Sequence, residues 1–263
     1  MNVSGQTVLI TGASGGLGQA IARRMREAGA IVRITARRTE ILDALAGEIG
    51  ATAIAADLSD RADVARLAEA SKDVDILVAN AALPGSGALD GFSPDQIDRA
   101  LEVNLRAPII LSRLLAPEMQ ARGRGQIVLM SSLLGKTSSP GSSIYCATKF
   151  GLRGFGQALR ADLRGTGVGV SVIFPGFVSE AGMFHESGTK LPSYIKTITP
   201  GACADAVIGA IEHDRGEVDV APATLRVGVK FSEIAPAIAA RVSDRLGARK
   251  IADQMSSGQS KKR

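Results

Sequence analysis

The feature that most constrains the fold of this chain is the alternation of short apolar runs with longer amphipathic stretches. "TVLIT" at Thr7–Thr11 is followed by "LGQAIARRMREAG", and "IVRITA" at Ile31–Ala36 is followed by "TEILDALAGEIG". Later runs of the first kind are "ATAIAA", "VDILVAN", "GQIVLMSS" and "VGVSVIFPG". They are almost continuously apolar, as expected of strands covered by helices on both faces. The pattern predicts an α/β fold with a doubly wound parallel sheet.

No linker or shift in composition divides the chain. Its 263 residues fit one large α/β domain or two small ones. We therefore expect a single domain over residues 1–246, followed by a looser tail over residues 247–263.

The composition argues against several classes of function. Only 3% of the residues are aromatic and none is Trp, so a stacking platform for nucleic-acid bases is not expected. The net charge of +5 is scattered, and the one basic cluster, "KKR" at the C-terminus, is interpreted as a solvated tail. The two cysteines and two histidines lack the spacing of a metal site or a disulfide framework, so we expect no metal.

Targeting signals are not evident either. The N-terminus enters a strand pattern almost at once, which leaves no room for a signal peptide. No apolar run approaches the roughly 18 residues that a transmembrane helix needs. The expectation is a reduced, cytoplasmic protein without a transmembrane segment.

A glycine-rich stretch, "TGASGGLG", joins the first apolar run to the first amphipathic one. Gly12 permits a sharp exit from the strand, Gly16 lets a pyrophosphate approach the backbone, and Gly18 permits close helix–sheet packing. The free N–H groups at the start of a helix then favour an anion. Such a turn can also be a plain strand–helix connection, but this context favours nucleotide binding.

The end of the second apolar run indicates which dinucleotide binds. An acidic residue is usual there when the ribose carries a free 2′-hydroxyl. Here Ala36 takes that place, and Arg37 and Arg38 follow it. A guanidinium can bind a 2′-phosphate in a bidentate way, whereas an acid would repel it. The sequence therefore predicts NADP(H) rather than NAD(H), although both arginines could also be surface charges.

Tyr145 and Lys149 form an i,i+4 pair in "YCATK", and Ser132 precedes them at a predicted strand end. Hydride transfer to a ketone leaves an alkoxide that needs a proton, which Tyr145 can donate. We expect the Lys149 cation to lower the pKa of Tyr145, and Ser132 to stabilise negative charge on the substrate oxygen. A serine hydrolase is disfavoured because the chain has no G-x-S-x-G elbow.

From Gly5 to about Ala221 the chain resembles the short-chain dehydrogenase/reductase family, whose fold is of the Rossmann type. The resemblance rests on the order and spacing of seven features: "TGASGGLG", Asp57–Leu58, "NAA" at Asn80–Ala82, Asn104, Ser132, "YCATK" and "PGFVS" at Pro175–Ser179. Two departures are Ala82 in place of the usual glycine and Ser179 in place of the usual threonine.

The resemblance implies specific roles. Tyr145 would be the general acid/base, Ser132 would position the substrate oxygen, and Lys149 would hold the nicotinamide ribose. Asn104 would hold a water that connects Lys149 to solvent. The expected cofactor-binding residues are Gly12, Ser14, Gly16, Leu17, Gly18, Arg37, Arg38, Asp57, Leu58, Asn80, Ala81, Tyr145, Lys149, Pro175, Gly176 and Val178.

Residues 177–199 lack a clear periodicity, and the family uses such a segment as a lid over the substrate. The expected substrate contacts are Ser132, Leu134, Tyr145, Phe177, Met183 and Phe184. They predict a largely hydrophobic carbonyl or secondary alcohol substrate, although these apolar residues could equally be core.

In the segment beyond residue 222, apolar residues recur at helical spacing, namely Ile234, Ile238, Val242 and Leu246. This segment could cover the substrate site, pack on a neighbouring subunit or touch a membrane surface, and packing is favoured. By resemblance the protein is expected to form a homo-oligomer, a dimer or a tetramer, through the helices that carry Asn104 and Tyr145.

The main hypothesis is therefore an NADP(H)-dependent oxidoreductase acting on a carbonyl or secondary alcohol. Enzymes of the same fold leave two alternatives, a ketoreductase acting on a carrier-bound acyl chain and an epimerase. A nucleotide-binding regulator without catalysis is the alternative from another class. The set of Ser132, Tyr145 and Lys149 disfavours it, because a regulator needs no tyrosine at the hydride site.

Overall fold

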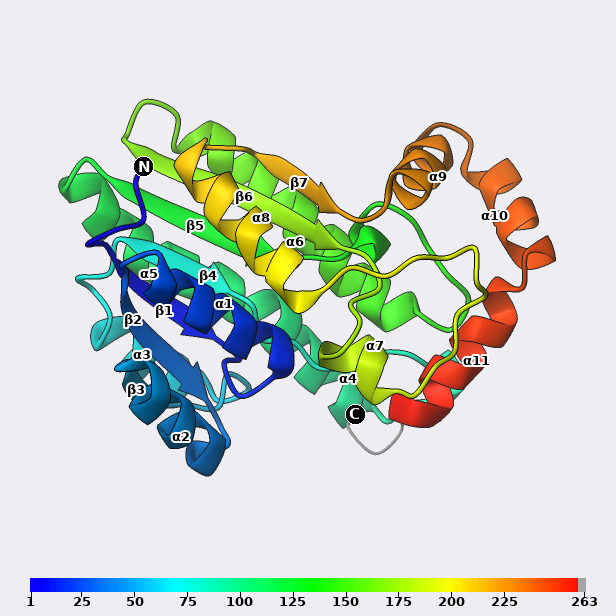
Figure 1. Cartoon of the computed structure of the whole chain (residues 1–263), viewed down its shortest axis with the longest axis horizontal. Coiled ribbons are helices and arrows are strands. Elements are labelled where there is room, and N and C mark those ends of the chain that lie inside the picture. Colours follow the sequence, from blue (N-terminus) through cyan, green and yellow to red (C-terminus); the bar gives the residue numbers. More distant parts are fainter. Residues whose placement is uncertain (260–263) are drawn as a thin grey trace.

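A seven-stranded parallel sheet forms the centre of the computed structural model, which describes residues 1–259 (Figure 1). The strand order is β3-β2-β1-β4-β5-β6-β7. The strands are β1 (Thr7–Thr11), β2 (Ile31–Ala36), β3 (Thr52–Ala55), β4 (Ile76–Ala79), β5 (Gly125–Met130), β6 (Val168–Pro175) and β7 (Glu217–Val220). The predicted doubly wound parallel fold is confirmed.

Helices cover both faces of the sheet. One layer contains α1 (Gly16–Glu27), α2 (Thr39–Ile49) and α8 (Pro200–Glu212). The other contains α3 (Arg61–Glu69), α5 (Ala107–Ala121) and α6 (Ser143–Asp162). Three short turns, η1 (Leu89–Gly91), η2 (Glu102–Arg106) and η3 (Leu133–Gly135), and α4 (Pro94–Leu101) complete this part of the chain.

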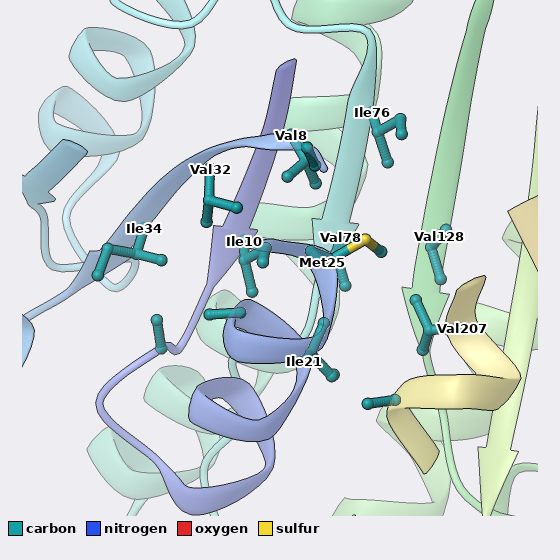
Figure 2. Close-up of a cluster of buried hydrophobic side chains, with 14 of the residues drawn as sticks. Val8, Ile10, Ile21, Met25, Val32, Ile34, Ile76, Val78, Val128 and Val207 are labelled. Carbon is teal, nitrogen blue, oxygen red and sulfur yellow. The ribbon is translucent and has the colours of Figure 1, made fainter. Parts of the chain in front are cut away.

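The strands are continuously apolar because each contributes to two cores. On β1, Val8 and Ile10 belong to the cluster that includes α1 and α8, and Leu9 belongs to the cluster on the opposite face. Figure 2 shows Val8 and Ile10 beside Ile21 and Met25 of α1. This double burial is what the absence of apolar–polar alternation predicted.

The strand order reverses beside β1, which pairs with β2 on one side and β4 on the other. Loops after these strands therefore diverge at the carboxyl edge of the sheet, where such folds bind ligands. The loops after β1 and β4 still touch, because a Cβ at Gly12 would lie 2.6 Å from the Cα of Ala81. Gly12 also has a φ of +69°, so both its conformation and its surroundings require glycine.

The helical segment formed by α4 and α5 has one irregularity. Between α4 and α5, η2 is a π-helical turn that contains Asn104. Such turns insert one residue into a helix and are frequent at functional sites. Asn104 is completely buried here.

The chain continues after β7 with α9 (Ala223–Ile234), α10 (Pro236–Arg245) and α11 (Ala248–Gln259). The expectation of a loose tail from residue 247 is therefore wrong as far as Gln259, because α11 packs on the segment that carries α7 (Gly182–Glu186). Its Gln259 Nε2 donates to the Met183 carbonyl at 3.1 Å. The basic cluster at residues 261–263 lies outside the described residues.

The four apolar residues that were expected to pack on a neighbouring subunit lie at the surface of the chain, and this packing stays a prediction. Ile234 is 83% exposed, and Ile238, Val242 and Leu246 are exposed as well. On α9 the buried residue is Val229, so the helix turns a different side toward the core. None of the described helices is long and apolar enough to cross a bilayer.

Candidate active site

A cavity of about 1470 Å³ lies at the carboxyl edge of the sheet. Every residue predicted to bind cofactor or substrate lines it, and of the predicted site residues only Asn104 does not. The sheet therefore brings together residues from Gly12 to Phe184, as the topology predicted.

The glycine-rich turn forms one end of this cavity. Ser14 and Gly15 precede α1, whose first residue is Gly16. A Cβ on Gly16 would lie 2.5 Å from the Cβ of Ala181, so the turn also contacts the segment after β6. Asn80 Nδ2 donates to the Thr11 carbonyl at 3.0 Å and fixes the loop after β4 beside the turn. Asn80 thus has a positioning role in addition to its predicted place in the cofactor site.

Two arginines flank the turn. Arg38 donates to the Ser14 carbonyl at 2.7 Å and to its Oγ at 3.3 Å. Arg37 lies 3.7 Å from the Asp57 carboxylate. Burial acts to raise the pKa of Asp57, but hydrogen bonds from Ser59 and the charge of Arg37 outweigh it, so the pKa is lowered. The carboxylate therefore stays ionised and holds Arg37 at the cavity wall.

The catalytic candidates meet where α6 crosses β5. Lys149 is 2% exposed, and its Nζ donates to the Met130 carbonyl at 2.8 Å. The same Nζ lies 5.5 Å from the ring centroid of Tyr145. Ser131 Oγ donates to the Lys149 carbonyl at 2.9 Å and so joins α6 to the strand end. Ser131 is therefore a packing neighbour of Lys149.

Burial controls the protonation of this pair. It raises the pKa of Tyr145 to about 12, against a smaller opposing effect of the hydrogen bond with Ser132. It lowers the pKa of Lys149 to about 8. Desolvation of the phenolate therefore dominates in the protein alone, and the expectation that Lys149 lowers the pKa of Tyr145 stays a prediction. Tyr145 is consequently a phenol at neutral pH.

Ser132 lies at the end of β5, beside this pair. Its Oγ accepts a hydrogen bond from the Leu134 backbone at 3.2 Å, and Ser132 is also a hydrogen-bond partner of Tyr145 in the cavity. Cys146, next to Tyr145, has a thiol whose pKa is raised by burial. It is thus held as a thiol at neutral pH.

Asn104 lies behind the cavity. Its Oδ1 accepts from the Leu83 backbone N–H at 2.6 Å, and its Nδ2 donates to the Leu83 carbonyl at 2.9 Å. The amide therefore fixes the loop after β4. The water-mediated link to Lys149 stays a prediction.

A charged cluster next to the cavity was missed by the sequence analysis. Lys136 Nζ lies 2.7 Å from the Asp219 carboxylate and 2.9 Å from that of Glu217. Arg153 also pairs with Glu217, at 2.8 Å, and with Glu233 of α9. Arg153 continues the four-residue spacing of Tyr145 and Lys149 along α6, which is the signal that could have identified it.

The opposite end of the cavity is apolar. Phe177 and Phe184, both expected to contact substrate, have ring centroids 5.0 Å apart. The ends of the predicted lid are joined, since Ile198 N donates to the Phe177 carbonyl at 2.9 Å and Ser179 N donates to the Ile198 carbonyl at 2.8 Å. The C-terminal helices contribute further apolar lining that the sequence analysis did not assign: Leu225, Val229, Phe231, Val242, Leu246, Ile251 and Met255.

The residues present fit a nicotinamide dinucleotide with a 2′-phosphate. The glycine-rich turn lacks side chains that would obstruct a pyrophosphate, and Arg37 and Arg38 supply positive charge at the end of β2. Among the described residues, Met130 is the only hydrogen-bond partner of the Lys149 ammonium, whose other N–H groups could serve ribose hydroxyls.

Comparison with known proteins supports this assignment. A family model described as short chain dehydrogenase matches residues 6–192. The chain is 36% identical over 227 residues to the ketoacyl reductase HetN of a Nostoc species, covering 83% of this chain and 79% of HetN. It is 33% identical over 180 residues to FabG of Rickettsia bellii, a 3-oxoacyl-(acyl-carrier-protein) reductase, covering 68% of this chain and 75% of FabG.

Solved structures agree. A short-chain dehydrogenase from Sphingobium yanoikuyae in complex with NADPH superposes with a TM-score of 0.77 at 28% identity, covering 91% of this chain and 96% of that one. The family match over residues 6–192 contains the glycine-rich turn, Ser132, Tyr145 and Lys149. The chain belongs to the short-chain dehydrogenase/reductase family of oxidoreductases.

Proposed function

We propose that this oxidoreductase uses NADP(H) to interconvert an apolar carbonyl compound and its secondary alcohol. The proposal rests on one cavity that contains both groups of residues. One end of it holds the glycine-rich turn, Arg37 and Arg38. Ser132, Tyr145 and Lys149 lie beside its apolar end. The NADPH bound in the similar Sphingobium structure supports the same cofactor.

Four residues share the chemistry. The bound nicotinamide supplies or accepts the hydride. Ser132 donates a hydrogen bond to the carbonyl oxygen of the substrate and stabilises the negative charge that develops there. Tyr145, a phenol at neutral pH, donates its proton to the resulting alkoxide. Lys149 holds the nicotinamide ribose and stabilises the phenolate that remains, and Asn104 holds a water for reprotonation.

Binding of the cofactor follows from the geometry of the carboxyl edge. The pyrophosphate site is formed by the glycine-rich turn, with Gly12, Ser14, Gly16, Leu17 and Gly18. The 2′-phosphate is bound by Arg37 and Arg38. The adenosine and nicotinamide contacts are assigned to Asp57, Leu58, Asn80, Ala81, Pro175, Gly176 and Val178, all of which line the cavity.

A ketoreductase acting on a carrier-bound acyl chain is the second candidate. It is favoured by the similarity to HetN and FabG, whose names describe ketoacyl reductases. The two candidates share the chemistry at Tyr145 and differ only in what the apolar end must accommodate. For an epimerase or a regulator without catalysis, the fold offers no comparable supporting observation.

In this proposal the enzyme is a cytoplasmic homo-oligomer, a dimer or a tetramer. Leu101 of α4 and Phe150 of α6 are exposed apolar residues on or next to the helices that the family resemblance assigns to subunit contacts. A sedimentation experiment on the parent protein and on Phe150→Asp tests this assembly, and a parent that sediments as a monomer contradicts it.

The function is tested by following NADPH and NADH oxidation with a panel of apolar ketones and a 3-oxoacyl thioester. We expect turnover with NADPH in preference to NADH, with Tyr145→Phe as the inactive control. Faster turnover of the thioester than of any free ketone would select the second candidate. Tight NADPH binding without turnover of any carbonyl or alcohol would contradict the proposal and indicate a regulator.

A further inference from the structure

The C-terminal helices turn apolar side chains away from the protein. Ile234 on α9 and Ile238 on α10 are 83% and 54% exposed, and Val242 and Leu246 are also exposed. We refer to these four residues as the C-terminal rim. Figure 1 shows α9, α10 and α11 following one another along the end of the molecule beyond β7.

The C-terminal rim borders the cavity. Val242 and Leu246 are exposed and also line the cavity, so its apolar end continues to the surface at this point. Tyr194 of the lid lies at the same place, where its hydroxyl donates to the Leu246 carbonyl at 3.0 Å. An apolar molecule at the C-terminal rim would therefore have a short, apolar route to the cavity.

Positive charge surrounds these apolar residues. The described part of the three helices carries six basic side chains, none of which forms an ion pair with another described residue: Arg226, Lys230, Arg241, Arg245, Arg249 and Lys250. Of the three acidic residues there, Glu233 already pairs with Arg153. The charge that remains beside the C-terminal rim is thus mainly positive and uncompensated.

We propose that the C-terminal rim docks this enzyme on the surface of an anionic lipid bilayer. Exposed aliphatic side chains on short helices, flanked by unpaired Arg and Lys, match the apolar boundary and the negative headgroups of such a surface. A second copy of the same face would bring like charges together, which disfavours a symmetric protein contact there. Entry of an apolar substrate from the lipid rests on the proposed function, whereas docking itself does not.

Docking is tested by cosedimentation of the full chain with vesicles of phosphatidylcholine alone and of phosphatidylcholine mixed equally with phosphatidylglycerol. We expect binding to the mixed vesicles that weakens as salt is added. Ile234→Asp with Ile238→Asp should lower the partition coefficient by about tenfold or more. Arg241→Glu with Arg245→Glu should lower it by roughly tenfold through the lost attraction to headgroups.

Matched controls carry the same changes elsewhere on the surface. Leu89→Asp replaces another exposed apolar residue, and Arg113→Glu with Arg164→Glu replaces two exposed arginines that form no ion pair among the described residues. These controls should bind vesicles as the parent does. NADPH-dependent turnover of a soluble ketone without vesicles should be unchanged in the Ile234/Ile238 variant, which separates docking from the proposed function.

Three results would overturn the proposal. The first is a parent protein that does not bind mixed vesicles at low salt. The second is binding that the control variants reduce as much as the rim variants do. The third is an interaction with protein in place of vesicles. Either binding to soluble poly-glutamate or a self-association that the Ile234/Ile238 variant loses would, without vesicle binding, assign the C-terminal rim to a protein partner.

Discussion

The two ends of the cavity are built in different ways. At the cofactor end, polar groups are fixed by the loops that leave the sheet, as in the bonds of Asn80 to Thr11 and Arg38 to Ser14. At the substrate end, the walls are the segment 177–199, which is the predicted lid, and the helices α9–α11. This segment and the helices are joined through a few contacts such as that of Gln259 with Met183.

This difference separates the region that the family model matches from the region beyond it. The family match ends at residue 192, before α9, α10 and α11 begin. The cofactor end and the reacting groups lie within the matched region, whereas much of the apolar wall lies outside it. Substitutions at the two ends should therefore affect different measurable quantities.

Tyr145→Phe, between the two ends, should have the largest effect. Loss of a general acid lowers kcat by about 100-fold to 10,000-fold. NADPH affinity, measured by fluorescence titration, should change little because the ring and its packing are kept. Turnover that survives at the parent level would show that Tyr145 does not donate the proton.

Lys149→Met tests the buried charge at the same boundary. The pKa of Lys149 is about 8 in the folded protein and 10.5 for an exposed lysine, so between these values the unfolded chain binds more protons. Lys149 should therefore contribute a rise of about 2 kcal/mol to the free energy of unfolding of the parent from pH 8 to pH 10.

The Lys149→Met variant should lack this rise in urea titrations over the same pH range. The exposed residue Lys196 provides the matched control, since Lys196→Met should keep it. A rise of equal size in Lys149→Met and the parent would show that another group is responsible.

Arg37→Ala should affect the cofactor end alone. Removing a charge-assisted contact to the 2′-phosphate should weaken NADPH binding by roughly ten- to hundredfold and leave NADH binding nearly unchanged. Arg61→Ala, which removes an arginine paired with Glu102, serves as control. Equal affinities of the parent for the two cofactors would contradict the assigned role.

Phe184→Ala should have the smallest effect, confined to the substrate end. Loss of its contact with Phe177 should raise KM for bulky apolar ketones by about five- to tenfold. The KM of Phe184→Leu should lie between those of Phe184→Ala and the parent. The dissociation constant of NADPH should stay the same in both variants. A KM that rises equally for the smallest ketone would indicate a general disturbance of the lid.

The sequence predicted which strand ends carry the candidate cofactor residues, because strand periodicity and the glycine-rich turn are local signals. The sheet then places Gly12, Arg37 and Tyr145 around one cavity without further information. The direction of the Tyr145 pKa was not predictable in this way, since it depends on how deeply α6 buries the phenol. The pairing of Lys136 with Asp219 likewise depends on two strands that are distant in sequence.

The C-terminal helices show more clearly what the sequence alone could not predict. The helical spacing of apolar residues indicated helices here, but it did not indicate which side of each helix would face the protein. These residues are Ile234, Ile238, Val242 and Leu246. That side is set by Val229 and by the pairing of Glu233 with Arg153, which are tertiary contacts. The expected tail beyond residue 247 failed for the same reason, because α11 depends on contact with the lid for its place.

The π-helical turn at η2 has a consequence for how this segment can vary. Deleting one residue from Glu102–Arg106 would restore regular α-helical geometry, because a π-helical turn holds one residue more than an α-helical turn. Ala100 and Leu111, which are buried on either side of the turn, would keep their present faces, but the turn that places Asn104 against Leu83 would be lost. Substitutions on the outer surface of this segment should therefore be tolerated where a one-residue deletion is not, so that its length is constrained more strictly than its sequence.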